Sequence, residues 1–281
     1  MTAIAESVTP SPTPRRRRPL IGLLAITAVL LVIVLWAIVP GLFTSYDPLA
    51  GDTEAIFAPP SAAHWFGADH LGRDVFARVV HGTVNTMATA AGAVAIGAIG
   101  GGLLGLLSPT GPRGLDPVVM RFIDVLTAIP GLLIALLLIS FTGPGLLPIA
   151  VGVGISSIAS FARVMRSEVL KVRGFDFVEA AALSGERRAS VLFRTILPNA
   201  AGPVLALVAV DLSAAILAIS GLGFLGYGAP PPTPEWGVLI ADGRNYLGTA
   251  WWMTTLPGLV IVVAVVALSA LSRRLLERAR V

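Results

Sequence analysis

This chain of 281 residues is 55% hydrophobic and only 13% charged, whereas about a quarter of the residues in an ordinary soluble domain are charged. It contains no cysteine, which excludes disulfide bonds and thiolate metal sites. Its net charge of +4 would suit nucleic-acid binding, but the basic residues lie beside long apolar runs. That placement indicates orientation in a membrane, so we expect an all-α membrane protein with no nucleic-acid partner.

The amino-terminal part predicts a polar tail followed by a membrane helix. Residues 1–19 are rich in Thr, Ser and Pro and include four consecutive arginines, so we expect a disordered cytoplasmic tail. Residues 20–43 are apolar and long enough to cross about 30 Å of hydrocarbon, which predicts the first transmembrane helix. A cleaved signal peptide is the alternative, but its apolar core would be shorter and a small-residue cleavage site would follow it.

The next segment, residues 44–83, is polar, and its acidic residues outnumber its basic ones. We therefore expect it on the external side of the membrane. It holds all three histidines of the chain. Because His64 and His70 are six positions apart, which is not the spacing of metal ligands on one helix face, we expect no metal site.

The remaining residues, 84–281, predict a core domain with five further transmembrane helices. Their apolar runs cover residues 84–107, 118–141, 145–162, 199–222 and 251–272. The first of these runs is rich in Gly and Ala, which lets helix backbones approach closely inside a bilayer. A Pro-Gly pair at 130–131 interrupts the second run, and a Trp pair at 251–252 opens the last one as an interfacial anchor.

The distribution of basic residues orients these six helices. With the amino terminus inside, the carboxyl terminus also lies inside, and the external segments hold only Arg73, Arg78 and Arg244. The other Lys and Arg residues concentrate in the amino-terminal tail, in the loop at residues 163–198 and after the last helix. This asymmetry follows the positive-inside rule, so we expect both termini and the 163–198 loop in the cytoplasm.

The 163–198 loop carries a motif with fixed spacing. The motif consists of a Glu-Ala-Ala sequence, a glycine and a final Leu-Pro pair: Glu179, Ala180, Ala181, Gly185, Leu197 and Pro198. An ordinary amphipathic helix on the membrane surface is the alternative for such a polar stretch. The full spacing, however, resembles the "EAA" loop of ABC-importer permeases. One departure is Thr195, at a position where that loop usually has an aliphatic residue.

The resemblance implies that this loop meets an ATPase subunit. We expect two amphipathic helices with a turn at Gly185, because glycine takes the left-handed conformation that redirects a chain. Glu179 would lie near a helix start and Pro198 in the first turn of the following membrane helix. The residues assigned to ATPase coupling are Glu179, Ala180, Ala181, Ala182, Gly185, Leu197 and Pro198.

Other stretches extend the resemblance to one family. Residues 64–76, His-Trp-Phe-Gly-Ala-Asp-His-Leu-Gly-Arg-Asp-Val-Phe, are similar to an external segment in the second permease subunit of dipeptide, oligopeptide and nickel ABC importers. Residues 121–133 and 224–237 resemble the third helix and the last external loop of that subunit. The resemblance implies a type I ABC-importer permease fold with six transmembrane helices in the bacterial plasma (inner) membrane.

The family resemblance also implies partners. Such importers combine a second, homologous permease subunit, two ATPase subunits and an extracytoplasmic substrate-binding protein, with lipid around the permeases. ATP and Mg would be bound by the ATPases, and we expect no cofactor in this chain. It has no Gly-x-x-x-x-Gly-Lys loop and no cluster of catalytic residues, so we expect a pore subunit and not an enzyme.

Two departures from the family pattern bear on the substrate. Ile219 takes a position where the family usually has Glu, and Arg273 lies in a basic ending where an acidic segment is usual. The implied substrate is a dipeptide or oligopeptide, with nickel or another metal chelate as the alternative. A self-sufficient secondary transporter is a more distant alternative, but it would show paired interrupted helices in two repeated halves.

Two aspartates fall within the apolar runs. Asp124 comes three residues after Arg121, so the two side chains share a helix face and can pair. Asp211 has no charged neighbour along its own helix and lies near the expected midplane. Because a carboxylate at that depth is costly unless it faces water or a polar partner, we expect Asp211 to line the translocation path, with a hydrogen-bonded structural role as the alternative.

Aromatic residues mark the external segments. Residues 60–76 and 224–246 are polar and aromatic yet lie outside the membrane, so we expect them to form the rim that receives the binding protein. The candidate rim residues are Trp65, Phe66, Trp236 and Tyr246.

Overall fold

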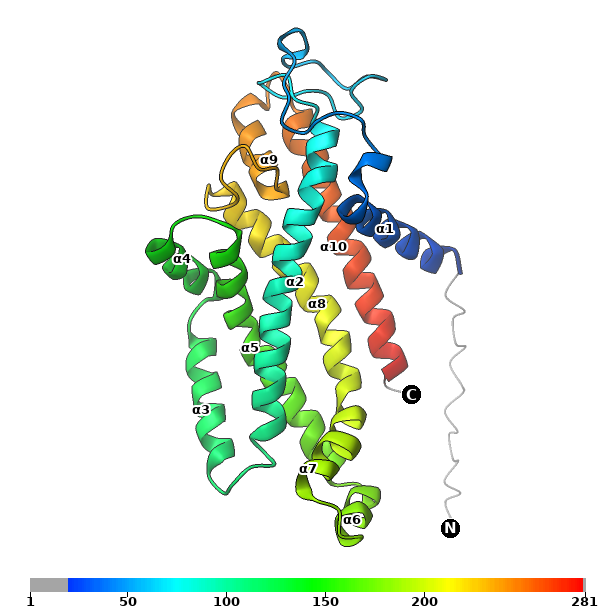
Figure 1. The fold of residues 1–281 in the computed structure, drawn as a ribbon, viewed down its shortest axis with the longest axis vertical. Coiled ribbons are helices and arrows are strands. Elements are labelled where there is room, and N and C mark those ends of the chain that lie inside the picture. Colours follow the sequence, from blue (N-terminus) through cyan, green and yellow to red (C-terminus); the bar gives the residue numbers. More distant parts are fainter. Residues whose placement is uncertain (1–19, 280–281) are drawn as a thin grey trace, which may run out of the picture.

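The computed structural model describes residues 20–279, so the tail at residues 1–19 lies outside the described part of the chain. Four long helices run along the long axis of the molecule: α2 (Val75–Leu107), α5 (Leu146–Arg173), α8 (Leu197–Phe224) and α10 (Trp252–Ala279) (Figure 1). All four are long and apolar enough to cross a membrane. The described residues contain no β-strand, which confirms the all-α class.

The interrupted helix is present as two pieces. α3 (Leu115–Ala128) and α4 (Gly131–Thr142) meet at a bend of 81° and together make up a fifth candidate span. The break lies at the predicted Pro-Gly pair. Pro130 has no N–H to donate and disfavours helical backbone at the residue before it, and Ile129 is extended with φ −95° and ψ 123°.

The first apolar helix is shorter than predicted. α1 spans Leu20–Ile38 and packs against α2 and α10, but its end was expected at residue 43. Val39 leaves the helical conformation, and Pro40 starts a separate 3-10 turn, η1 (Pro40–Leu42). The cause is again proline, which cannot donate the hydrogen bond that would continue the helix.

Two other helix boundaries were also predicted wrongly. α2 begins at Val75 instead of residue 84, because Asp74 caps it by accepting the N–H of Ala77 at 2.6 Å. α5 continues to Arg173 instead of ending at residue 162, since residues 155–173 contain no Gly or Pro. The first part of the predicted cytoplasmic loop is therefore an extension of a membrane helix.

α2 and α5 pack closely against each other, and this contact depends on glycine. Gly97, Gly101 and Gly105 recur every four residues and so share one face of α2. A Cβ added to Gly101 would collide with the carbonyl oxygen of Ile158, and the same is true of Gly105 and the carbonyl oxygen of Ala162. The close backbone approach that the small residues predicted is confirmed.

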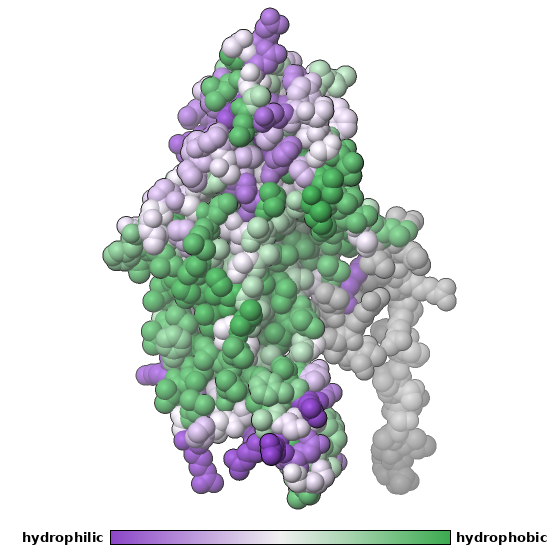
Figure 2. Space-filling model, viewed as in Figure 1, coloured by the Kyte–Doolittle hydropathy of each residue, from purple (hydrophilic) through white to green (hydrophobic). Residues whose placement is uncertain are grey.

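Hydrophobic side chains form a belt around the middle of the molecule, with polar side chains at both ends (Figure 2). The outer segment, residues 44–74, lies at one end beside α9 (Trp236–Gly243), and the segment between α5 and α8 lies at the other (Figure 1). A belt of this kind suits lipid contact in the middle and water at the two ends.

Candidate functional site

The segment that holds the predicted coupling residues, residues 176–198 and called the coupling segment below, projects from one end of the bundle (Figure 1). Its first helix is α6 (Asp176–Leu183), and Glu179 lies in its first turn, where the helix dipole favours negative charge. Val178 is buried, and Ala181 packs against the core. Glu179, Ala180 and Ala182 are exposed. α6 is therefore held through Val178 and Ala181 and leaves small side chains exposed.

The predicted turn at Gly185 is confirmed. Gly185 has φ +85°, in the left-handed region, and its N–H donates to the carbonyl of Ala182 at 3.3 Å. A Cβ at this position would meet no atom within 4 Å. Glycine is therefore required here by the backbone conformation and not by crowding.

The helix expected after Gly185 is present, but it is not separate. α7 (Arg188–Ser190) continues through a widened π turn, η3 (Val191–Ile196), directly into α8, so the helical run extends to Phe224. Pro198 lies in the first turn of α8, as predicted. The preceding π turn accommodates a proline ring that would otherwise crowd the carbonyl one turn earlier. No loop therefore separates this end of the segment from α8.

A groove of about 1040 Å³ runs beside the coupling segment. One wall is the turn before α3, residues 107–115, and the other comes from α6, α7 and η3. Glu179, Ala182 and Leu192 are among its lining residues, together with Arg173, which donates to the carbonyl of Pro109. The groove combines apolar and charged residues on the end of the bundle that also carries α6.

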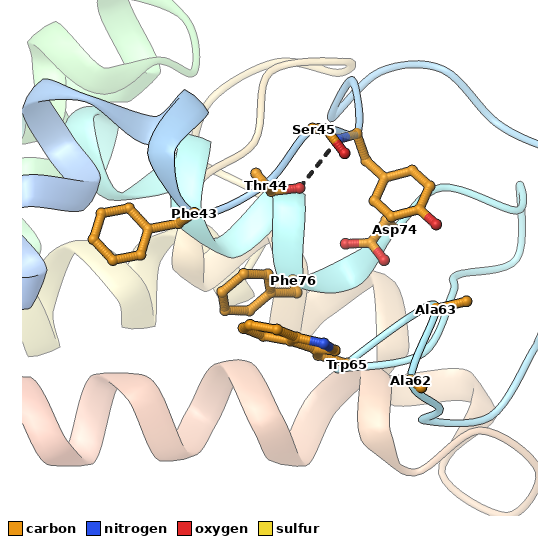
Figure 3. Close-up of a pocket in the computed structure, with 9 residues that line it drawn as sticks. Phe43, Thr44, Ser45, Ala62, Ala63, Trp65, Asp74 and Phe76 are labelled. Carbon is orange, nitrogen blue, oxygen red and sulfur yellow. Dashed lines mark hydrogen bonds between the residues drawn. The ribbon is translucent and has the colours of Figure 1, made fainter.

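At the opposite end, Trp65 borders an outer cavity of about 280 Å³. The cavity is lined by Phe43, Thr44, Ser45, Tyr46, Ala62, Ala63, Trp65, Asp74 and Phe76. Figure 3 shows the Trp65 ring lying against Phe76, with ring centroids 5.0 Å apart. Trp65 is still 62% exposed, so this residue is available to a partner in the way the sequence predicted for the rim.

The other three candidate rim residues are less accessible. Phe66 and Tyr246 are half-buried, and Tyr246 packs against Phe57 and His70. Trp236 is fully buried, and its indole N–H donates to the carbonyl of Val79 at 3.1 Å. The expectation of Trp236 on an exposed rim is therefore wrong. The indole fills a core position between α2 and α9, a place that its sequence neighbourhood did not reveal.

A buried ion cluster ties the outer segment to the bundle. Asp69 accepts from Arg73 Nε and from Arg78 Nη1, both at 2.7 Å, and Arg78 also reaches Asp242 at 3.3 Å. Burial by itself would raise the pKa of Asp69. The backbone N–H groups of Arg73 and Leu71 and the two arginine charges outweigh it and hold that pKa below its ordinary value.

A cavity of about 340 Å³ lies at the middle of α8 and contains Asp211. The lining comes from the start of α4, from α5 and from α8: Gly131, Leu132, Val153, Ser156, Ser157, Ser160, Asp211, Ala214, Ala215 and Ala218. Asp211 Oδ2 has no hydrogen-bond partner among the described residues. The cavity therefore offers one carboxylate and several hydroxyls in an otherwise apolar site.

The second membrane aspartate has a different partner from the one that helix spacing suggested. Asp124 accepts from Arg163 of α5 at 3.1 Å, and both side chains are largely exposed. Pairing with Arg121 in the same helix was thus predicted wrongly, because the packing of α3 on α5 brings an arginine across. In the described part of the chain, no three His, Asp or Glu side chains gather as they would around a metal ion.

The family model for the inner membrane component of binding-protein-dependent transport systems matches residues 97–281, well over half of the chain. The chain belongs to this family. It is accordingly a multi-pass protein of the bacterial inner membrane.

Curated relatives of this permease cover most of its length. It is 36% identical over 246 residues to the di/tripeptide transport system permease protein DppC of Pseudomonas aeruginosa (strain UCBPP-PA14), covering 85% of this chain and 81% of the relative. The probable D,D-dipeptide transport system permease protein DdpC of Escherichia coli (strain K12) is 37% identical over 242 residues, with the same two coverages.

Solved structures show the same fold at low identity. A chain from inward-facing conformations of the MetNI methionine ABC transporter aligns with a TM-score of 0.59 and 18% identity, covering 72% of this permease and 96% of that chain. A chain from an amino acid ABC transporter with histidines aligns with a TM-score of 0.56 and 18% identity, covering 72% and 94%. The core of the permease therefore has the ABC-importer architecture.

One charged residue of the permease was not singled out from the sequence. Glu235 is fully buried at the start of α9, where it accepts from the N–H groups of Gly237 and Val238 at 2.9 and 3.0 Å and from the hydroxyl of Thr86 at 3.2 Å. Burial raises the pKa of Glu235 despite these donors. The sequence signal that could have identified Glu235 is a carboxylate directly before an apolar run, at the position that caps a helix.

Proposed function

We propose that this permease is the pore subunit of an ATP-driven importer for dipeptides or oligopeptides, which passes substrate from an extracytoplasmic binding protein to the cytoplasm. The observation that carries the proposal is the exposed α6 helix beside the groove, joined through Gly185 to the start of α8. A self-sufficient channel has no use for a docking helix there. The relatives named for di/tripeptides and D,D-dipeptides support the substrate class.

The proposed topology has six transmembrane helices and both termini in the cytoplasm. α1, α2, the α3–α4 pair, α5, α8 and α10 would be the six helices, with the coupling segment inside and the outer segment outside. Two observations support it: these segments lie at opposite ends of the bundle (Figure 1), and the Lys and Arg residues of the chain concentrate on the proposed inner side.

The proposed assembly contains a second permease, two ATPases and a binding protein. α6 would dock into a cleft on one ATPase, using the small exposed side chains of Ala180 and Ala182. Closure of the ATPases on ATP would then displace α6 and α7, and α8 would carry the displacement to the cavity at Asp211. The continuous helical run from Arg188 to Phe224 supports this route, because it contains no loop that would absorb the movement.

Chemistry and transport are divided between chains in this proposal. The ATPases would bind ATP and Mg and hydrolyse the nucleotide, and this chain would hold no cofactor of its own. Its contribution would be a path whose access alternates between the two sides of the membrane, and Asp211 would line that path. Selection of substrate would rest mainly with the binding protein, which leaves a metal chelate as the alternative cargo.

Reconstitution of the whole importer in proteoliposomes tests this function. With the binding protein outside and ATP available to the ATPases, labelled dipeptide should accumulate, and omission of either ATPase should abolish uptake. Uptake of nickel in place of dipeptide would establish the metal-chelate alternative. Uptake that persists without the ATPases, driven by an ion gradient, would show a secondary transporter and overturn the proposal.

A further inference from the structure

The cavity at the middle of α8 combines features that recognise a particular chemical group. We infer that it is a binding site for the α-ammonium group of the transported peptide, with the Asp211 carboxylate as counter-ion and serine hydroxyls as further acceptors. This inference rests on the proposed function and adds to it the group of the substrate that the pore itself contacts.

The size of the cavity fits part of a peptide better than a lone ion. Its volume is about 340 Å³, and a water molecule occupies roughly 30 Å³ of liquid. There is therefore space for about ten waters, or for an amino-terminal residue with some hydration. The alanines of α8, at positions 214, 215 and 218, keep the wall beside Asp211 free of bulky side chains.

The acceptor groups in the cavity match an alkylammonium. Asp211 Oδ2 is without a hydrogen-bond partner among the described residues. The Ser156 hydroxyl donates to the carbonyl of Val153 at 2.6 Å, which leaves its oxygen lone pairs to accept. An ammonium group has three N–H donors, and a bond from such a donor to a carboxylate is stronger than one between neutral groups.

No cation compensates the charge of Asp211 within the described chain, although the Ser157 hydroxyl hydrogen-bonds to this carboxylate. Of the described residues that line the cavity, Asp211 alone is charged. Asp124 contrasts with it, because Arg163 lies 3.1 Å from that carboxylate. A carboxylate at membrane depth is costly unless a cation or water stabilises it, and the amino terminus of a peptide supplies that cation during passage.

Thiol labelling of the cavity tests the inference, since the chain has no native cysteine. Ser160 is exposed and lines the same cavity, so the reporter is Ser160→Cys in the whole importer, reconstituted without binding protein to remove its selectivity. Labelling rates are compared for a cationic and an anionic methanethiosulfonate reagent. Relative to their rates with a free thiol in solution, we expect the cationic reagent to react roughly tenfold faster than the anionic one, because the carboxylate attracts it. Asp211→Asn should abolish the preference, and Asp124→Asn should leave it unchanged.

A second measurement identifies the ligand. The dipeptide Ala-Ala should slow labelling of Ser160→Cys, whereas N-acetyl-Ala-Ala at the same concentration should not, and Asp211→Asn should remove the protection. Equal relative labelling rates for the two reagents, or equal protection by the two peptides, would show that the cavity does not bind the ammonium group. If the wild-type importer still shows ATP-driven dipeptide uptake after either of these results, the proposed function is retained and only the proposed ammonium site is rejected.

Discussion

At the scale of single residues, backbone conformation and burial separate positions that have the same residue type. Gly185 is needed for its positive φ in open space, whereas Gly101 is needed because backbone atoms of α5 lie where a Cβ would be. Trp65 is largely exposed, and Trp236 is fully buried. The two members of each pair should therefore respond differently to the same substitution.

Substitution of Gly185 by Val should uncouple transport. A β-branched residue at φ +85° costs about 1–2 kcal/mol or more and shifts the turn that joins α6 to α7. We expect dipeptide uptake to fall at least roughly tenfold while membrane insertion is unchanged. The control is Gly248→Val, at another glycine with no atom near its missing Cβ but without a positive φ. Normal ATP-driven uptake by the Gly185→Val importer would count against a coupling role for this turn.

The two tryptophans give a second pair of outcomes. Trp65→Ala should weaken capture by the immobilised binding protein and leave the melting temperature of the purified complex unchanged, because this side chain is 62% exposed. Trp236→Ala should instead destabilise the permease by about 3–5 kcal/mol, since it empties a core position and removes the donor to Val79. Unchanged capture with Trp65→Ala would assign that residue to packing on Phe76.

At the scale of elements, α2 and α5 form a closely packed pair, and α8 contacts both of them. Lipid provides no hydrophobic drive for helix association, so this pair depends on close packing of small residues. The face with Gly97, Gly101 and Gly105 allows contact with the α5 backbone, and α5 then places its serines opposite α8. The α5 wall of the Asp211 cavity therefore belongs to a helix that is packed closely on the glycine face of α2.

Substitution of Gly101 by Val should separate these helices. Its side chain would overlap the backbone of α5 at Ile158 and Ala162, and relief requires movement of the helix axis. We expect a loss of stability of about 1–3 kcal/mol, the usual range for overpacking. Gly92→Val on the same helix is the matched control, because its missing Cβ has only the Ala150 Cβ at 3.9 Å nearby. Equal melting temperatures for the two variants in detergent would refute this account.

At the scale of the whole molecule, the outer segment is held by charge and the membrane part by apolar packing. Asp69, Arg73, Arg78 and Asp242 connect residues 44–74 to α2 and α9, with three of the four side chains nearly inaccessible to solvent. Removal of one member leaves the others buried without full compensation. The outer surface is thus fixed relative to the pore, as receipt of a binding protein requires.

Two buried carboxylates should give opposite dependences on pH. The pKa of Glu235 is raised above its ordinary 4.5, so its stabilising contribution is lost as the pH rises through the raised value. Glu235→Gln should therefore gain melting temperature relative to the wild type as the pH is raised from 4 to 8, an interval that begins below the ordinary pKa. The pKa of Asp69 is lowered from 3.8, so its contribution is fully present above that pH and is lost only in stronger acid.

Asp69→Asn serves as the comparison. It should be less stable than the wild type by about 3 kcal/mol at both pH 5 and pH 8, with no change in the gap, because the carboxylate is ionised throughout that interval. The assigned directions would be contradicted if the stability difference between Asp69→Asn and the wild type grew with pH. They would also be contradicted if the difference between Glu235→Gln and the wild type stayed the same.

The sequence by itself determined the membrane class, the order of the apolar runs, the break at Pro130 and the turn at Gly185. These features depend on composition and on local backbone preferences, which neighbouring residues specify. The tertiary structure alone decided that Trp236 is buried, that Asp124 pairs with Arg163 and that serines of α5 lie opposite Asp211. Those contacts join helices far apart in the chain, and hydrophobic periodicity does not specify which faces meet. Which faces meet is a property of the assembled bundle.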